Sequence, residues 1–306
     1  MPSEATHAAR PALAPLERAT GLHLEIVAGL TGGEAGAVEV RDPGGRRLVL
    51  KAWPGSPADG ADLQARLGLV AQLRRSGYPA PAYVVSGWFE GHIVAVQTWA
   101  EGGQRDDLTT AMVERLIELT GRHADARVPA SGEFRDWLVR SLLEGCDGYC
   151  LHAPLAAYSD ETRRLLDCVR TIGARSADAP VPAAGFVHRD FHHRNALWRG
   201  DDVAAVVDWE GAGSGDPAFD LVTLAFGLSV SAAPAPAREL PWAAAERSCP
   251  PQLLRAYVAH MALRQVDWSI RHRADADVAR WLAIGRAALD RYGGGAPVRP
   301  RGRSGS

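Results

Sequence analysis

Apolar residues in the first third of the chain fall in short runs that are separated by turns rich in glycine and proline. One run covers residues 22–30, residues 37–53 have the pattern of a hairpin around Asp42-Pro43-Gly44-Gly45, and residues 80–99 carry two further runs around Glu90-Gly91. Short apolar runs bounded by such turn residues are typical of β-strands. The pattern therefore predicts five short strands between residues 22 and 99.

One helix is predicted between the third and fourth strands, from about Ala61 to Ser76. Its apolar stripe has members three or four residues apart: Leu63, Leu67, Val70 and Leu73. This spacing places the four side chains on one helix face, and Gly77 is the residue type that commonly follows a helix end. Five strands and one helix predict a small α+β lobe.

The pattern changes from strand to helix near Glu101-Gly102-Gly103. Helical periodicity follows at 107–125, 133–149, 160–175, 250–273 and 276–291, with a loop rich in alanine and proline at 232–237. This change predicts two lobes, residues 1–100 and residues 101–291. Residues 292–306 have a composition that is typical of disorder.

Charge and hydropathy narrow the class of protein. The formal net charge of −2 at pH 7 argues against a surface built for nucleic acid or anionic membranes. No apolar run approaches the roughly 20 residues that a membrane-spanning helix needs, and residues 1–10 lack the hydrophobic stretch of a secretory signal. We therefore expect a cytoplasmic enzyme that has neither a nucleic-acid nor a membrane partner.

The chain has four cysteines, at positions 146, 150, 168 and 249, and no Cys-x-x-Cys pair. Cys146 and Cys150 are four residues apart, which places them on one face of the helix predicted there. Buried free thiols are the expected state of such cysteines, and neither a disulfide nor a zinc site is predicted.

Two polar motifs carry the candidate chemistry. In residues 188–195 (HRDFHHRN), the carboxylate of Asp190 precedes the carboxamide of Asn195 by five residues, and Asp208 ends the apolar run of residues 203–208. Phosphoryl transfer from a magnesium nucleotide needs a carboxylate that accepts a hydroxyl proton and oxygen ligands for the metal. The motifs therefore favour Asp190 as a general base, with Asn195 and Asp208 as magnesium ligands.

Two segments of the first lobe suit phosphate groups, although each also has an ordinary structural interpretation. Lys51, at the end of a predicted strand, is either a phosphate clamp or a solvated strand-end lysine. The segment Gly29–Gly36, with Gly32 and Gly33 at its centre, either brings backbone N–H groups to phosphates or forms a hairpin turn. It is not a Walker A loop, because no Gly-Lys-Ser/Thr sequence follows the glycines.

Two further acidic residues lie after the second motif, and both are expected to be structural. Asp216 followed by Pro217 predicts a helix N-cap with proline at the first helical position. Asp220 is expected to hydrogen-bond backbone groups or the loop at residues 188–195 rather than a metal ion.

Taken together, these motifs resemble the aminoglycoside phosphotransferase family, small-molecule kinases that share the protein-kinase architecture. The matching stretches are GFVHRDFHHRNALW (185–198), VAAVVDWEGAGSGDPAFDL (203–221), RLVLKAW (47–53) and LRRSGYPAP (73–81). The resemblance runs from about residue 24 to 290 and is densest between 185 and 221. It implies an α+β, bilobal protein-kinase-like fold, with a small β-rich N-lobe containing one main helix and a larger, mostly helical C-lobe.

The resemblance also implies roles for individual residues. By position, Asp190 looks like the catalytic base, and Asn195 and Asp208 look like the two ligands of Mg²⁺. Lys51 is similar to the lysine that grips the α- and β-phosphates of ATP or GTP.

Further residues receive roles from the same resemblance. The hinge that binds the nucleotide base through its backbone would be residues 97–100, with Gln97, Trp99 and Ala100 as cofactor-binding residues. His188 and Arg189 would brace the catalytic loop. Arg194, inside that loop, either stabilises the transferred charge or faces solvent.

The sequence departs from the family pattern on the predicted helix. The family usually pairs its strand lysine with a glutamate on this helix, but the corresponding position here is Arg66. Either Asp62 takes the place of that glutamate, or the alignment shifts by one helical turn.

The substrate half of the chain is not acidic, although aminoglycosides are polycations. Residues 231–290 contain eight arginines and six acidic residues, together with Trp242, Trp268 and Trp281. This balance favours a less cationic substrate, aromatic or nucleoside-like.

The expected function is transfer of the γ-phosphoryl group of ATP or GTP to a hydroxyl of a small molecule, with inactivation of an antibiotic as the consequence. Metabolic kinases of choline, homoserine or fructosamine type are the first alternative. A non-catalytic nucleotide-binding regulator is the second alternative, favoured only by the missing glutamate.

Overall fold

The computed structural model of the protein describes residues 4–30, 36–126, 133–177, 179 and 185–292. The chain packs into two compact units, Met1–Ala130 with Ala183–Trp242 and Ser131–Pro182 with Ala243–Ser306. The predicted lobes, residues 1–100 and 101–291, divide the chain by expected role, nucleotide binding and catalysis. They do not coincide with these packing units, and the division by role stays a prediction.

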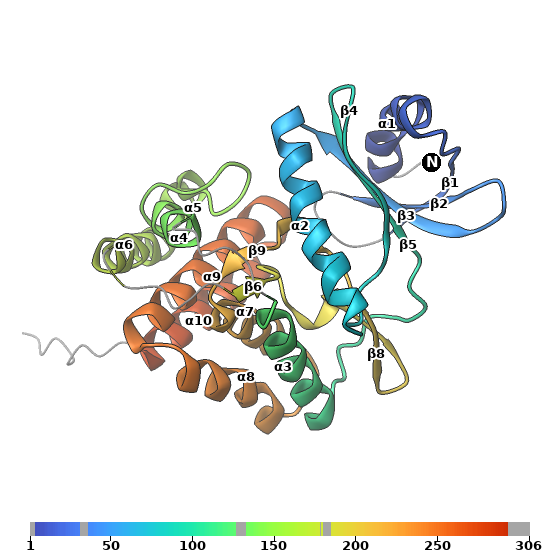
Figure 1. The fold of residues 1–306 in the computed structure, drawn as a ribbon. Coiled ribbons are helices and arrows are strands. Elements are labelled where there is room, and N and C mark those ends of the chain that lie inside the picture. Colours follow the sequence, from blue (N-terminus) through green and yellow to red (C-terminus); the bar gives the residue numbers. More distant parts are fainter. Residues whose placement is uncertain (1–3, 31–35, 127–132, 178, 180–184, 293–306) are drawn as a thin grey trace, which may run out of the picture. The chain divides into compact units, whose positions relative to one another are not determined.

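The first unit contains a five-stranded antiparallel sheet (Figure 1). Its strands lie in the order β1-β2-β3-β5-β4. Their bounds are β1 Glu25–Leu30, β2 Ala37–Arg41, β3 Arg47–Pro54, β4 Tyr83–Phe89 and β5 His92–Thr98. All five strands predicted from the apolar runs are therefore confirmed.

Helix α2, Pro57–Arg75, covers one face of this sheet. The predicted stripe is buried, because Leu63, Leu67, Val70 and Leu73 are each at most 4% exposed. The helix begins four residues earlier than predicted, since the N-cap Ser56 and Asp59 in the first turn form a capping box and proline is well tolerated at the first helical position. It ends as predicted before Gly77, whose φ is +82°.

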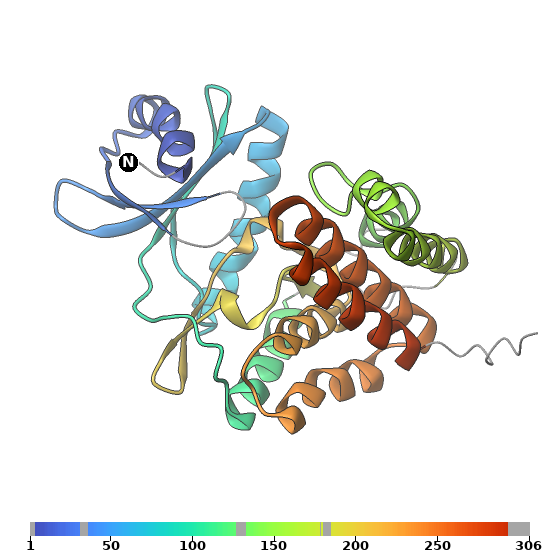
Figure 2. The same cartoon turned by 180° about the vertical axis from the view of Figure 1, so that it is seen from behind.

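A second helix, α1 (Glu4–Thr20), covers the opposite face of the sheet and was not predicted. Ala9, Ala12 and Leu16 pack there against apolar side chains of β2, β3 and β5. Figures 1 and 2 show this helix beside the sheet, away from α2. Pro11 and Pro15 lie inside it, and alanines carry much of its contact face, so the usual apolar signal is weak.

The remainder of the first unit surrounds the two polar motifs. It contains the helices α3 Thr110–Ala124, α7 Pro217–Ser229 and the start of α8 Ala235–Ser248. Two small antiparallel sheets pair β6 (Gly185–Val187) with β9 (Gly213–Gly215), and β7 (Ala196–Arg199) with β8 (Asp202–Val206). The predicted loop at 232–237 is wrong in its second half, because α8 begins at Ala235.

The described residues of the second unit form helices and connecting turns. The unit contains α4 Glu133–Leu143, α5 His152–Tyr158, α6 Asp160–Ser176, α9 Pro251–His272 and α10 Asp275–Arg291, with α9 and α10 side by side (Figure 2). The helix predicted over 133–149 ends at Leu143, because Gly145 and Gly148 adopt φ of +93° and +83°. Cys146 and Cys150 therefore do not share a helix face, and both are free thiols.

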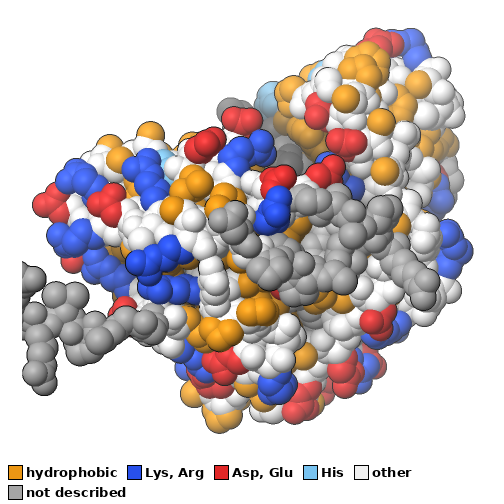
Figure 3. All heavy atoms as spheres, turned by 60° about the vertical axis from the view of Figure 1, so that its left-hand side comes forward, with side chains coloured by type: hydrophobic (Ala, Val, Ile, Leu, Met, Phe, Trp, Pro, Cys, Tyr) orange, Lys and Arg blue, Asp and Glu red, His pale blue; other side chains and the backbone are white. Residues whose placement is uncertain are grey.

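Basic and acidic side chains are interspersed on the face shown in Figure 3, in keeping with the net charge of −2. Among the helices of the described residues, none is both long and apolar enough to cross a membrane.

Leu16→Ala tests the contribution of α1 to the sheet. Leu16 is fully buried, and such truncations remove apolar contacts and leave a cavity. We expect the free energy of unfolding in urea to fall by about 3 kcal/mol. The exposed Arg10→Ala on the same helix should change it by less than about 0.5 kcal/mol; equal effects of the two changes would contradict the packing of α1.

Candidate active site

The catalytic loop begins at a buried carboxylate in the first turn of α7. Asp220 is fully buried, and its two oxygens accept the backbone N–H groups of His188 (2.7 Å) and Arg189 (2.9 Å). This confirms the prediction that Asp220 bonds the loop. Asp216 caps α7 by accepting the N–H of Ala218, which is the predicted N-cap.

A buried chain of hydrogen bonds continues from Asp220 into two other elements. Nε2 of His123, on α3, lies 2.9 Å from Oδ2 of Asp220, and Nδ1 lies 3.0 Å from the hydroxyl of Tyr78, just after α2. Burial raises the pKa of the Tyr78 hydroxyl well above its usual value, so the hydroxyl stays neutral. The loop is thus anchored to α7, to α3 and to the end of α2.

The His188 ring joins the two motifs. Its Nε2 donates to the carbonyl of Val207 (2.8 Å), and its Nδ1 accepts the N–H of Asp190 (3.3 Å). Burial lowers the pKa of this imidazole, and a neutral ring with one donor and one acceptor fits both partners. His188 therefore braces the loop, as does Arg189, which donates to the carbonyl of Ser214.

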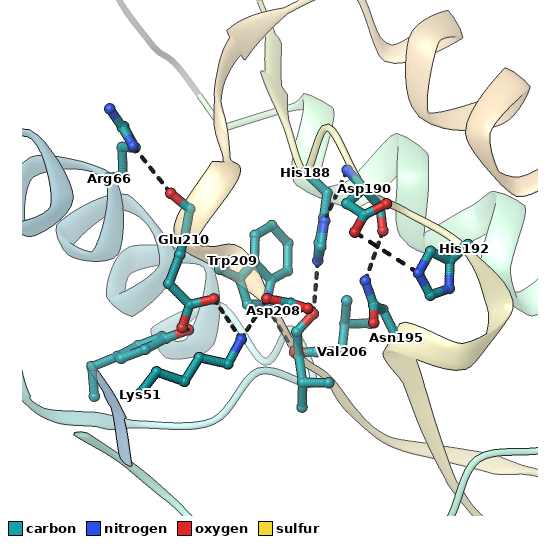
Figure 4. A network of polar contacts seen from close by, with 12 residues as sticks. Lys51, Arg66, His188, Asp190, His192, Asn195, Val206, Asp208, Trp209 and Glu210 are labelled. Atoms are coloured by element: carbon teal, nitrogen blue, oxygen red, sulfur yellow. Dashed lines mark hydrogen bonds and ion pairs between the residues drawn. The ribbon is translucent and has the colours of Figure 1, made fainter. Parts of the chain in front are cut away.

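The β7–β8 hairpin brings Asn195 next to the second motif. Ala196 pairs with Val206 at the open end of the hairpin, and the N–H of Val207 then donates to the carbonyl of Asn195 (2.8 Å). The Asn195 amide donates to the carbonyl of Asp190 (2.9 Å), which leaves its Oδ1 to accept. Figure 4 shows the residues of both motifs gathered in one network.

Lys51, on β3, reaches this network from the sheet. It is the only lysine in the chain, and its Nζ lies 2.5 Å from Asp208 Oδ1 and 3.0 Å from Glu210 Oε2 (Figure 4). Its side chain is 14% exposed, so the solvated strand-end interpretation does not hold. The Lys51 ammonium points toward the carboxylates of Asp208 and Glu210 instead.

Burial and neighbouring charges shift the pKa values of the triad formed by Lys51, Asp208 and Glu210. Burial alone would lower the pKa of Lys51, but Glu210 and Asp208 outweigh it and raise that pKa. Burial would raise the pKa of Asp208, but Lys51 holds it well below its usual range. For Glu210, burial and the neighbouring Asp208 raise the pKa against the opposing charge of Lys51.

Glu210 was missed by the sequence reasoning. It stands two residues after Asp208 within a short 3₁₀ turn, Trp209–Gly211, and Asp208 itself has a left-handed φ of +74°. The only signal was its place in the Asp-Trp-Glu triplet. Asp62, one of the two alternatives considered for the missing helix glutamate, lies 3.9 Å from Arg66.

The predicted hinge is partly occupied by its own contacts. The N–H of Trp99 donates to the carbonyl of Arg47 (3.3 Å), and the Arg47 guanidinium lies 3.6 Å from the centroid of the Trp99 ring. Gln97 is 7% exposed, and its Oε1 has no partner among the described residues. Ala100 lies two residues after the end of β5. The predicted glycines Gly32 and Gly33 lie outside the described residues.

Arg194 forms a paired cluster beside the loop. Its guanidinium donates to both oxygens of Asp106, at 3.0 and 3.1 Å, and Asp106 also lies 2.9 Å from Nε2 of the buried His193. Arg194 is half exposed. It neither faces solvent freely nor points without a partner into the site, because Asp106 binds it. On the other side of the loop, His192 Nε2 lies 3.8 Å from Asp190 Oδ2.

The donor atoms of the site fit a hard cation better than a soft one. Asp208 and Asn195 offer carboxylate and carboxamide oxygens, and Mg²⁺ is commonly held by one or two protein oxygens together with phosphate oxygens. Among the described residues, no group of three or more His, Cys, Asp or Glu side chains is arranged to hold a metal. The oxygens of Asp208 and Asn195 are thus donors of the kind that Mg²⁺ binds.

Comparisons with known proteins agree with this arrangement. The family described as the phosphotransferase enzyme family matches residues 27–257. A comparison with curated protein sequences found no match.

Solved structures share the fold at low sequence identity. The apo form of a thermostable mutant of aminoglycoside phosphotransferase APH(4)-Ia is 20% identical, with a TM-score of 0.64 over 92% of this chain and 100% of that chain. Spectinomycin phosphotransferase APH(9)-Ia, solved with ADP and spectinomycin, is 13% identical, with a TM-score of 0.58 over 92% and 93%. Amicoumacin kinase hAmiN, solved with AMP-PNP, is 13% identical, with a TM-score of 0.60 over 90% and 92%. These likenesses confirm the predicted α+β, protein-kinase-like fold.

Asp220→Ala and Tyr78→Phe test the buried anchor. The first change leaves two buried N–H groups, those of His188 and Arg189, without an acceptor, and each such group costs about 1–3 kcal/mol. We expect Asp220→Ala to lower the free energy of unfolding by about 3 kcal/mol or more, and Tyr78→Phe by about 1 kcal/mol. Urea denaturation measures both; a Tyr78→Phe effect as large as that of Asp220→Ala would contradict this hierarchy.

The burial of His193 predicts that the folded protein loses stability at acidic pH. Burial lowers the pKa of His193 from 6.5 to about 4, so between these values the unfolded chain takes up a proton that the folded chain does not. Stability is then full above about pH 6.5 and falls by about 3 kcal/mol as the pH drops toward 4. Unfolding of the wild type and of His193→Asn between pH 7 and 4.5 measures this; equal pH slopes would refute it.

Proposed function

Because the chain belongs to the phosphotransferase enzyme family, we propose that it transfers the γ-phosphoryl group of ATP or GTP to a hydroxyl of a small molecule in the cytoplasm. Asp190 is the proposed general base, since it sits on a loop held at both ends and carries the carboxylate that suits a hydroxyl proton.

One observation carries this proposal. Lys51 lies on Asp208, and Asn195 is held beside Asp208 by the backbone bond from Val207, so a phosphate-binding cation and two oxygen ligands converge near the base. A set of this kind positions a nucleotide and neutralises its charge, which is most of what phosphoryl transfer requires of a protein.

Asn195 and Asp208 are the proposed ligands of Mg²⁺. The metal, when bound, supplies charge neutralisation for the phosphate oxygens. The protein's own contribution is geometric, because the hairpin fixes the Asn195 backbone and Lys51 fixes the Asp208 carboxylate.

The proposed nucleotide site extends from Lys51 to the hinge. Gln97 lies two positions beyond Ala95, which pairs with Lys51, so both face the same side of the sheet. An amide has a donor and an acceptor, and Gln97 therefore suits the amino group of adenine and the carbonyl of guanine equally. Trp99 and Ala100 are proposed to bind the base through their backbone, and Gly32 and Gly33 to cover the phosphates.

Arg194 is proposed to stabilise the transferred charge. Its guanidinium is bidentate to Asp106 in this structure, so this role requires the pair to open when the charged substrate arrives. The alternative is that Arg194 and Asp106 only hold the loop.

The proposed acceptor is an antibiotic less cationic than an aminoglycoside, for example a nucleoside-like compound. Support comes from the excess of arginine over acidic residues at 231–290 and from the antibiotic kinases that share the fold. A metabolic kinase of choline, homoserine or fructosamine type remains the alternative. The argument for a non-catalytic regulator weakens, because Glu210 supplies Lys51 with the carboxylate that the helix lacks.

The decisive experiment offers the protein ATP or GTP with magnesium and a panel of antibiotics and metabolic alcohols. Nucleotide consumption should depend on one acceptor class, and a host strain expressing the protein should become resistant to that class. Consumption with metabolic alcohols alone would favour the metabolic kinase. Nucleotide binding without transfer to any acceptor would reject the enzyme.

Asp190→Asn tests the base directly. The amide keeps the shape of the side chain but cannot accept a proton, so kcat should fall by about 10³-fold, while nucleotide affinity measured by calorimetry should change by less than about threefold. A variant that retains more than a tenth of wild-type turnover would remove Asp190 from this role.

A further inference from the structure

Arg66 contacts the backbone of the residue that pairs with Lys51. From α2, its Nη1 donates to the carbonyl oxygen of Glu210 at 3.0 Å (Figure 4). The side chain of the same Glu210 lies 3.0 Å from Lys51 Nζ. Glu210 is thus held by its backbone from the helix and by its carboxylate from the sheet.

We propose that Arg66 is a positioning residue that keeps the Glu210 carboxylate on Lys51. The helix thereby reaches the lysine through a backbone carbonyl of the 209–211 turn instead of through an acidic side chain of its own. The consequence for turnover rests on the proposed function; the contact itself does not.

The turn that carries Glu210 is anchored at Trp209, which is fully buried and donates to the carbonyl of Val206, and it receives a bond at the next residue from Arg66. It is a single 3₁₀ turn that follows the left-handed Asp208, and short 3₁₀ segments have poorer hydrogen-bond geometry than α-helices. The Tyr83 hydroxyl is 3.5 Å from Glu210 Oε1, at the limit of a hydrogen bond. The charge-assisted bond from Arg66 is stronger than such a contact.

The competing partner of Arg66 is weak. Asp62 lies 3.9 Å from Nη2, and its side chain is 71% exposed, so this i,i+4 pair contributes little. The Glu210 carbonyl belongs to a residue whose side chain is only 12% exposed. We therefore assign the guanidinium to the carbonyl and not to the surface pair.

The two carboxylates beside Lys51, those of Asp208 and Glu210, have different proposed roles. Asp208 is the proposed metal ligand, so its charge is shared between Lys51 and the nucleotide site. Glu210 is then the carboxylate that pairs with Lys51 without a proposed metal role, and its loss leaves the ammonium free to take other orientations.

The single lysine of the chain provides a specific test. An amine-reactive acylating reagent modifies only Lys51 and the N-terminal amine, and peptide mass spectrometry separates the two. Arg66→Met keeps the aliphatic stem and removes the donors, and Arg74→Met on the exposed side of α2 is the matched control. We expect Arg66→Met and Glu210→Gln each to raise the Lys51 acylation rate by about fivefold, and Arg74→Met to leave it unchanged.

The double variant distinguishes positioning from a general structural effect. If Arg66 acts through the Glu210 carboxylate, Arg66→Met adds less than about twofold in the Glu210→Gln background. Effects that multiply would overturn the proposal, as would an Arg66→Met protein with wild-type circular dichroism and a wild-type acylation rate.

Measurement of kcat and KM provides a second test of the role of Arg66. Arg66→Met should lower kcat by about fivefold with KM for the nucleotide changed less than twofold, and Arg66→Lys, which retains a charged donor, should recover most of the loss. A change confined to KM would overturn the positioning role. Acylation needs no substrate, so a wild-type protein that transfers phosphate to no acceptor rejects the proposed function while the acylation result still decides the role of Arg66.

Discussion

The buried Asp220 carboxylate is the interaction on which the site depends. Its oxygens accept two consecutive N–H groups of the catalytic loop, and His123 holds it from α3. In a buried environment such bonds are strong, and an unmatched partner is costly, so the loop has one stable conformation at its start. The β7–β8 hairpin then fixes its end at Asn195. Between these two anchors, Asp190 is held at its N–H by His188 and at its carbonyl by Asn195.

The second constraint is the ion pair that Lys51 of the sheet forms with Asp208, a residue distant in the sequence. Lys51 is separated from Asp208 by 157 positions, and all other Lys/Arg positions of the chain are arginine. An ammonium is a compact point charge, whereas a guanidinium presents a broad planar fork. The single Nζ of Lys51 contacts one oxygen of Asp208 and one of Glu210, whereas the Arg194 guanidinium bonds both oxygens of Asp106.

Much of this arrangement could be predicted from sequence because its signals are local. Strands and α2 follow from apolar spacing, the cap at Asp216 from the following proline, and the polar motifs from residue types at short separation. Helix α1 was not predicted because alanines and two internal prolines weaken its pattern of apolar residues. The early end of α4 depends on glycine backbone angles, and the role of Glu210 on a contact between segments 159 positions apart, which no periodicity encodes.

The contacts of Glu210 explain how the site accommodates an arginine on α2. A carbonyl is present whatever side chain stands at position 210, so the bond from Arg66 constrains the turn but does not select the residue. The ion pair with Lys51 does depend on the side chain, since it requires a carboxylate that reaches Nζ. The helix therefore supplies position and the turn supplies charge, two tasks that one helix carboxylate would otherwise combine. An acidic residue on α2 is for this reason not required for a buried, paired lysine in this chain.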